Sequence, residues 1–95
     1  MRVVWLDSAL TDLEEIADYI ARNSPAAAAR LIQGAFDAVD GLADYPELGR
    51  RGRVDDTREL VVLKGRYIVA YHIEGREVEI WAVRDARQLW PETFS

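Results

Sequence analysis

The hydrophobic pattern of this 95-residue chain changes its period once, and that change constrains the fold more than any other feature. Between Leu10 and Pro46 the apolar residues recur at helical spacing. From Thr57 onward, runs rich in Val, Ile, Tyr and Trp have the character of strands. Between them lies an arginine-rich connector, PELGRRGRVDDTREL, residues 46–60. By its length the chain is expected to form one domain, residues 1–95, in which helices and strands share a core.

The N-terminal half predicts a short strand and a helix. The run RVVWL, residues 2–6, is apolar apart from its first residue and predicts a buried strand. Asp7 or Ser8 is expected to cap the helix that follows, because both side chains accept hydrogen bonds from free backbone N–H groups. The apolar stripe of this helix consists of Leu10, Leu13, Ile16, Ala17 and Ile20. The acids between them predict a solvated opposite face.

A second helix follows the break at residues 22–25, RNSP. Ser24 is a favoured cap, and Pro25 suits the first helical position. The helix is expected to continue until Pro46 ends it. Its buried stripe is predicted to be Ala28, Leu31, Ile32, Ala35, Phe36, Val39, Leu42 and Ala43. Because so few residues join the two helices, they should pack as an antiparallel hairpin.

Three strand-like runs make up most of the C-terminal half: RELVVL, RYIVAYHI and EVEIWAV. The glycine-bearing links KG and EGR between them predict tight antiparallel hairpins. A three-stranded meander is barely stable alone, so its apolar face requires the helical hairpin as a cover. The first strand is expected at a sheet edge or beside the last strand. The predicted fold class is therefore α+β: an N-terminal strand, an antiparallel helical hairpin, a three-stranded antiparallel meander and a short C-terminal tail.

Charge and composition narrow the classes of function. The net charge is −5 and the pI about 4.8, whereas domains that bind nucleic acid through its phosphates are usually basic. Residues 1–48 carry three arginines against nine acids, and residues 49–95 carry nine Lys and Arg against eight acids.

The absence of cysteine excludes disulfides and thiolate-bound metals, and we expect neither a metal nor a cofactor. The apolar run VVWL is too short for a signal peptide or a membrane span, so we expect a cytoplasmic protein that does not enter a membrane.

Four segments carry a likeness to a known family. They are DYPELGR, RELVV, YIVAYHI and VEIWAVRDAR, in that order. Together they resemble the RelE/ParE superfamily of bacterial toxins from type II toxin–antitoxin systems, over the stretch from Leu6 to Trp90. The resemblance implies one of two activities. RelE-like members cleave messenger RNA in the ribosome, whereas ParE-like members are not nucleases and act on DNA gyrase.

The residues favour the ParE-like branch. Cleavage of RNA through its 2′-hydroxyl needs a base, an acid and cations for the charge on the phosphorane. The ribonuclease branch has a strand arginine where this chain has Ile68, and strand lysines near the apolar run 60–62. Trp90 stands where a catalytic acid is wanted, and an indole does not release its proton usefully. We therefore expect no catalytic residues.

Three side chains leave a catalytic alternative open. His72, the single histidine, is either a general acid or base, or a half-exposed polar residue on a strand. Glu47 and Glu59 are either bases or members of surface ion pairs with neighbouring arginines. We expect the structural role for each of the three.

The resemblance also implies a cognate antitoxin, a small protein that lays helical and extended segments over the hairpin and sheet of the toxin. Four aromatic residues are candidate contacts for it, with core packing as the alternative. They are Trp5, Tyr19, Tyr45 and Trp81. The connector arginines are candidates for holding acidic residues of the antitoxin through bidentate pairs. They are Arg50, Arg51, Arg53 and Arg58.

The connector has a structural interpretation as well, and we prefer it. Pro46 stops the helix, and Gly49 and Gly52 are expected to supply turn geometry that few other residues tolerate. Asp55 and Asp56 partly neutralise the local arginines, which weakens a phosphate-binding role.

For the target of the toxin, the resemblance points to the C-terminal end, with Arg84, Arg87 and Trp90 as candidate residues. The alternative is that both arginines are surface charges and that Trp90 pins the tail to the sheet. We therefore interpret the chain as a toxin that binds and poisons DNA gyrase and forms a hetero-oligomer with its antitoxin. Two alternatives stay open: a ribosome-dependent mRNA interferase, and a non-toxic relative that only binds its antitoxin.

Overall fold

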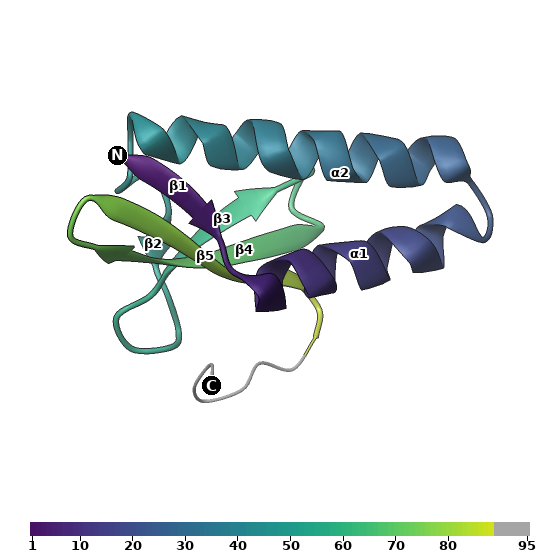
Figure 1. The fold of residues 1–95 in the computed structure, drawn as a ribbon. Helices are drawn as coiled ribbons and strands as arrows, with labels where there is room; N and C mark the ends of the chain where they lie inside the picture. The colour runs from purple at the N-terminus through teal and green to yellow at the C-terminus, as the bar shows by residue number, and fades with distance from the viewer. Residues whose placement is uncertain (89–95) are drawn as a thin grey trace.

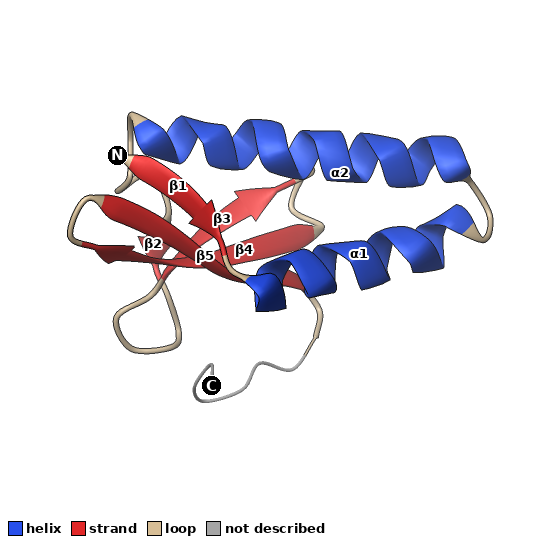
Figure 2. Ribbon diagram, viewed as in Figure 1, coloured by secondary structure: helices blue, strands red, loops and turns tan. Residues whose placement is uncertain are grey.

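The computed structural model describes residues 1–88 and shows two helices lying across one face of a five-stranded sheet (Figure 1). The chain runs in the order β1 (Arg2–Trp5), α1 (Asp7–Ala21), α2 (Pro25–Asp40), the 3-10 helix η1 (Gly41–Ala43), β2 (Arg50–Arg51), β3 (Arg58–Val62), β4 (Tyr67–Glu74) and β5 (Glu77–Asp85). Figure 2 shows the helices and strands as two separate layers. The predicted α+β fold is confirmed.

The sheet has the strand order β1-β5-β4-β3-β2 and joins a local meander to one distant strand. β3, β4 and β5 are antiparallel neighbours in chain order, as the short glycine-bearing links predicted. β1 lies parallel to β5 at one edge, which confirms both parts of the expectation for this strand. The two-residue strand β2 was not predicted; it pairs with β3 from within the connector.

The start of α1 differs from the prediction. Leu6 occupies the cap position without a side-chain hydrogen bond, and Asp7 is already the first helical residue. Ser8 does not cap the helix either, because its hydroxyl donates to the backbone oxygen of Trp81 at 2.7 Å. The serine therefore ties α1 to β5, while the charge of Asp7 in the first turn favours the helix through its dipole.

The start of α2 follows the prediction and its end does not. The Ser24 hydroxyl accepts a hydrogen bond from Ala27 N at 3.1 Å, and Pro25 takes the first helical position. The helix ends at Asp40, well before Pro46, and the 3-10 helix continues it through Ala43. The prediction that Pro46 ends the helix was therefore wrong.

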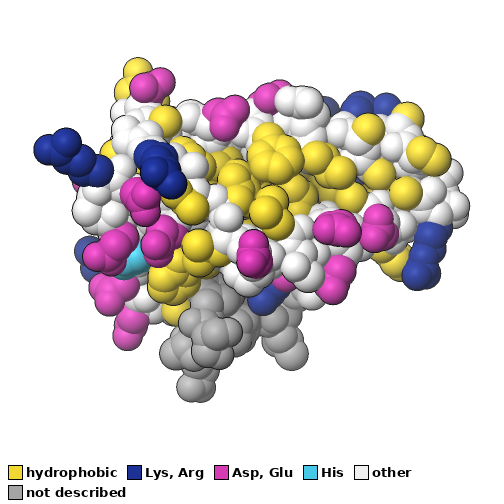
Figure 3. Space-filling view, viewed as in Figure 1, with side chains coloured by type: hydrophobic (Ala, Val, Ile, Leu, Met, Phe, Trp, Pro, Cys, Tyr) yellow, Lys and Arg dark blue, Asp and Glu magenta, His cyan; other side chains and the backbone are white. Residues whose placement is uncertain are grey.

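The core lies between the helical hairpin and the helix-facing side of the sheet. Its most deeply buried members are Ala9, Ala35, Val39, Leu42, Val69, Tyr71, Val78, Ile80 and Val83. Alanine on the helices leaves room for the larger side chains of the strands. Leu10 and Ile32, both predicted for the buried stripes, are exposed. Hydrophobic side chains also gather at the surface where α1, α2 and β1 meet (Figure 3).

A β-bulge interrupts the pairing of β4 with β5. Ala70 lies opposite Ala82 and Tyr71 lies opposite Ile80, so Trp81 is the extra residue of β5. A bulge turns a side chain away from the regular alternation of the strand. It brings the ring of Trp81 to 5.2 Å from that of His72.

Candidate interaction surfaces

The connector folds around one buried carboxylate, that of Glu59 on β3. Its side chain is 3% exposed and accepts hydrogen bonds from Arg53 N at 2.9 Å, Arg53 Nε at 3.1 Å and Arg50 Nη2 at 3.2 Å. Burial alone would raise the pKa of Glu59, but these hydrogen bonds outweigh it and hold the pKa below its ordinary value of 4.5. The expected ion pairs are present. The expected surface position was wrong, because the loop of residues 50–53 folds over the carboxylate.

Tyr71 ties the connector to β4. Its hydroxyl donates to Pro46 O at 2.7 Å and accepts from Gly49 N at 2.8 Å. Burial raises the pKa of Tyr71, so the hydroxyl keeps its proton for the first of these bonds. Arg58 adds another tie by donating to Gly49 O at 2.8 Å and, more weakly, to the backbone oxygen of Glu47 at 3.4 Å. Most of the connector arginines are therefore engaged by the fold itself.

The two connector glycines are needed for close packing rather than for turn geometry. A Cβ at Gly49 would lie 2.7 Å from the Tyr71 ring and 2.9 Å from Glu59 O. A Cβ at Gly52 would lie closer still to the hydroxyl of Thr57 and 3.0 Å from its backbone oxygen. Neither glycine has a positive φ, so the predicted reason for them was wrong.

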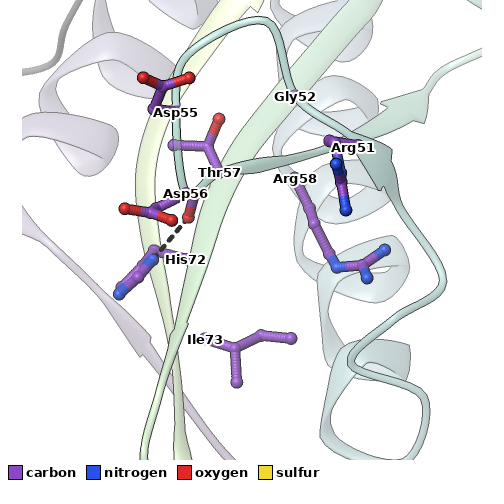
Figure 4. Close-up of a pocket in the computed structure, with 8 residues that line it drawn as sticks. All are labelled: Arg51, Gly52, Asp55, Asp56, Thr57, Arg58, His72 and Ile73. Carbon is purple, nitrogen blue, oxygen red and sulfur yellow. Dashed lines mark hydrogen bonds between the residues drawn. The ribbon is translucent and has the colours of Figure 1, made fainter.

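A pocket of about 560 Å³ lies where the loop between β2 and β3 meets β4 (Figure 4). It is lined by Arg51, Gly52, Asp55, Asp56, Thr57, Arg58, His72 and Ile73. Nδ1 of His72 lies 2.6 Å from Asp56 O, and its Nε2 lies 2.9 Å from a carboxylate oxygen of Glu74. Both partners only accept, so the geometry suits the imidazolium, and these two hydrogen bonds raise the pKa of His72. The protonated ring of His72 therefore links the loop between β2 and β3 to β4 through its hydrogen bond to Asp56 O, and we call this contact the imidazolium latch.

The four aromatic candidates fall into two pairs by exposure. Tyr19 on α1 and Tyr45 after η1 are 68% and 70% exposed. Trp5 is half-buried, and its ring meets that of Phe36 on α2 at 4.8 Å. Trp81 is half-buried at the bulge. Packing within the fold thus accounts for much of each tryptophan, whereas both tyrosines project into solvent.

The ion pairs of the two C-terminal arginines differ in their exposure to solvent. Arg84 of β5 donates to Asp12 of α1 at 2.7 Å, in a partly buried pair. Arg87 pairs with Asp85 at 3.2 Å and is 85% exposed. Trp90 lies outside the described residues.

Tyr19, Arg84 and Arg87 line one hollow of about 440 Å³ between α1 and the end of β5. The sequence assigned the tyrosine to the antitoxin and both arginines to the target. The fold places one of the eight candidate antitoxin contacts, Tyr19, beside two candidate target residues. We refer to this place as the β5 hollow.

Another group of cations was missed in the sequence. Arg30 of α2 and Lys64 and Arg66 of the turn between β3 and β4 line a pocket of about 320 Å³. These residues are far apart along the chain, and the segment LKGR carries the pattern of a turn alone. Only the packing of the helical hairpin on the meander brings them together, so no local motif marks them.

Residues 1–88 contain neither a candidate metal centre nor a candidate membrane-spanning helix. No group of three or more His, Asp or Glu side chains in that range has an arrangement suited to a metal ion. No helix in the same range combines the length and apolar character required to cross a bilayer.

Comparison with known proteins gives consistent matches over nearly the whole chain. Residues 3–90 match the family model described as the ParE toxin of the type II toxin–antitoxin system parDE. The chain is 47% identical over 93 residues to the protein named toxin Y4kP of Sinorhizobium fredii, covering 98% of this chain and 96% of that protein. It is 42% identical over 88 residues to Toxin RelE2 of Caulobacter vibrioides, covering 93% and 98%. A solved chain of the chromosomal ParDE TA system from P. aeruginosa has the same fold, with a TM-score of 0.80 at 23% identity over 92% of this chain and 97% of that chain.

Proposed function

This chain belongs to the ParE toxin family of type II toxin–antitoxin systems, and we propose that it arrests growth by binding and poisoning DNA gyrase until a cognate antitoxin covers it. In this mechanism the toxin makes the cleaved gyrase–DNA complex persist, and gyrase itself breaks the DNA. The toxin then needs a binding surface and no catalytic residue. The site of action is the cytoplasm, and the neutralised form is a hetero-oligomer of toxin and antitoxin.

The observation that carries the proposal is the β5 hollow. Aromatic residues and arginine are enriched among the residues that dominate binding energy. This hollow presents Tyr19 beside Arg84 and Arg87, which are paired with Asp12 and Asp85 in the same hollow. An antitoxin segment lying over Tyr19 would deny both arginines to the target. Poisoning and neutralisation thus compete for one surface.

The remaining antitoxin contacts are proposed from their exposure and bonding. Tyr45 and Arg51 project from the surface and offer direct contact. The other connector arginines act by holding the shape of the loop, because the fold already engages them; they are Arg50, Arg53 and Arg58. Trp5 and Trp81 offer the half-buried edges of their rings. Trp90 remains a proposed target residue on the basis of the resemblance alone.

Ribosome-dependent cleavage of messenger RNA is the second candidate function, favoured by the likeness to the protein named RelE2. Such a reaction needs cations and a proton-transfer group around one phosphate. Arg51, Arg58 and His72 line one pocket and would be the residues to use (Figure 4). Asp55 and Asp56 line it too and oppose a phosphate there.

The test mixes the purified protein with DNA gyrase, ATP and plasmid, then adds detergent and protease and measures linear DNA. Linear product that rises with the dose of toxin is expected. Arg87→Glu should reduce it strongly, since the charge of this exposed side chain is reversed in the β5 hollow. Arg76→Glu is the matched control, because Arg76 lies at the other end of β5, roughly 30 Å away by strand length.

Three outcomes contradict the proposal in different ways. Equal loss in both variants means that overall charge, and not the β5 hollow, governs activity. Cleavage of a message on ribosomes without linear plasmid supports the interferase instead. Normal growth of cells that express the folded toxin without antitoxin indicates a non-toxic relative.

A further inference from the structure

The pocket lined by Arg30, Lys64 and Arg66, which we call the hairpin-end pocket, has the construction of a binding site. It lies where the end of α1, the start of α2 and the turn between β3 and β4 meet. Its other lining residues are apolar: Ile20, Ala27, Leu31, Leu63 and Tyr67. Its volume of about 320 Å³ is at the lower end of pockets that enclose small ligands, which suits one or two protein side chains.

Two of the three cations of this pocket, Arg30 and Lys64, are not used by the fold. The third, Arg66, adds to Arg87 in lowering the pKa of Asp85. Arg30, Lys64 and Arg66 are exposed, and within residues 1–88 their side chains make no ion pair and no hydrogen bond. No carboxylate lines the pocket with them. On a chain with a net charge of −5, a pocket edged by cations alone marks a local site for negative charge.

The turn that carries Lys64 is held in an uncommon backbone conformation. Leu63 and Lys64 have φ values of 53° and 58°, and Gly65 follows with 86°. Two consecutive left-handed residues are the geometry of a type I′ hairpin turn, and the hydrogen bond from Gly65 N to Val62 O closes this one at 3.2 Å.

Gly34 of α2 leaves room for this turn to approach the helix. A Cβ at Gly34 would lie 2.8 Å from Cδ2 of Leu63, so the leucine packs directly on the helix backbone. Glycine inside a helix is less favourable than alanine. The helix accepts this cost where Leu63 docks, and the docked turn keeps Lys64 and Arg66 at the pocket.

From this construction we propose that the hairpin-end pocket receives an apolar side chain of the antitoxin that is flanked by acidic residues. The identity of the partner as the antitoxin rests on the proposed function. The pocket and the residue types that line it are features of this chain. An apolar floor inside a charged edge is the arrangement of an anchoring contact in a protein interface. A bound segment can continue from there along α1, because the pocket and the β5 hollow share Ile20, Arg66 and Tyr67.

The experiment measures the affinity of the antitoxin, taken as the small protein encoded beside the toxin, for two kinds of toxin variant. Arg30→Glu combined with Lys64→Glu reverses two charges that line this pocket but not the β5 hollow. Affinity should fall by roughly 10- to 100-fold, with a weaker dependence on salt. Arg76→Glu, an exposed cation on another turn, should leave affinity unchanged.

The second variant fills the pocket without altering charge. Ala27→Trp places a large ring where the anchor is proposed to sit, and affinity should fall by roughly 30-fold or more, as for loss of an anchoring contact. Ala26→Trp adds the same ring at the neighbouring exposed position, outside the pocket, and should bind normally. Circular dichroism melts of each variant verify folding.

The antitoxin affinities and the gyrase assays of these variants together test the proposal. Weakened antitoxin binding with intact gyrase poisoning supports the proposal. Affinity within about twofold of the wild type in both variants overturns it. Loss of gyrase poisoning with unchanged antitoxin affinity also overturns it and assigns the pocket to the target. If even the wild type fails to poison gyrase, the proposed target is wrong, while the affinity comparison still tests the pocket.

Discussion

The connector and the hairpin-end pocket both gather cations, and they use them in opposite ways. In the connector, Arg50 and Arg53 surround the buried carboxylate of Glu59. At the hairpin-end pocket, Arg30 and Lys64 make no such pairs within the described part of the chain. The denser arginine cluster in the sequence is thus the less available to a partner. What decides availability is whether the fold supplies a buried acceptor, and a count of arginines does not reveal that.

The largest effect should come from removing the acceptor of the connector. Glu59→Gln keeps the shape of the side chain but leaves the guanidinium groups of Arg50 and Arg53 without a carboxylate. Because hydrogen bonds to charged groups are strong when buried, unfolding free energy should fall by about 2–3 kcal/mol. Urea titration measures it, with Glu77→Gln as a control on the exposed pair with Arg2. Equal effects at both positions would contradict the special role of Glu59.

The same substitution has a pH signature. The folded pKa of Glu59 is lowered, so its contribution to stability is present above its ordinary pKa of 4.5 and is lost as pH falls through the folded value. The difference in stability between wild type and Glu59→Gln should therefore be largest near neutral pH and shrink below about pH 4.5. A difference that grows on acidification would overturn the assignment.

The next effect should come from Tyr71, the second support of the connector. Tyr71→Phe removes the hydroxyl and leaves Gly49 N without its buried acceptor. Unfolding free energy should fall by about 1–2 kcal/mol, with the core unchanged. Hydrogen exchange of the Gly49 amide should accelerate in the variant. Unaltered exchange would mean that Arg58, through Gly49 O, suffices to hold this stretch.

The change of period was enough to predict the fold class, because helices and strands of this length must cover one another to make one core. Local chemistry predicted the Ser24 cap and the antiparallel pairing of the meander. Predictions from local patterns failed where a side chain bonds to a partner outside its own segment. Ser8 donates a hydrogen bond to the backbone of Trp81 on β5 and does not cap its own helix. The same reason explains why Glu59 was expected at the surface.

The sequence could name individual candidate residues, but it could not show which of them lie together in the fold. Exposed Tyr19 and Arg87 were named from the sequence, but only the fold puts them into one hollow. The hairpin-end pocket left no local trace, since its cations come from a helix and from a turn far along the chain.

A smaller effect is expected at the latch between the connector loop and β4. The pKa of His72 is raised in the fold by its hydrogen bonds to Asp56 and Glu74, with Glu79 also facing the ring. Its contribution is therefore fully present below the ordinary pKa of 6.5 and is lost as pH rises through the folded value. His72→Gln should lower stability by about 0.5–1 kcal/mol at pH 5.5 and by less at pH 8.5. A larger loss at pH 8.5 would contradict the imidazolium latch.

The smallest effect, and the sharpest contrast with the connector, is expected at the hairpin-end pocket. Arg30→Gln combined with Lys64→Gln removes two charges that the fold does not pair, so unfolding free energy should change by no more than about 0.5 kcal/mol. The same two-charge removal in the connector, Arg50→Gln with Arg53→Gln, exposes the buried carboxylate of Glu59 and should cost several times as much. Parallel urea titrations of both variants make the comparison direct.

If the pocket variant loses as much stability as the connector variant, its cations serve the fold and the case for a docking site there is lost. If it does not, these charges lie ready for a partner, because no part of the described fold depends on them.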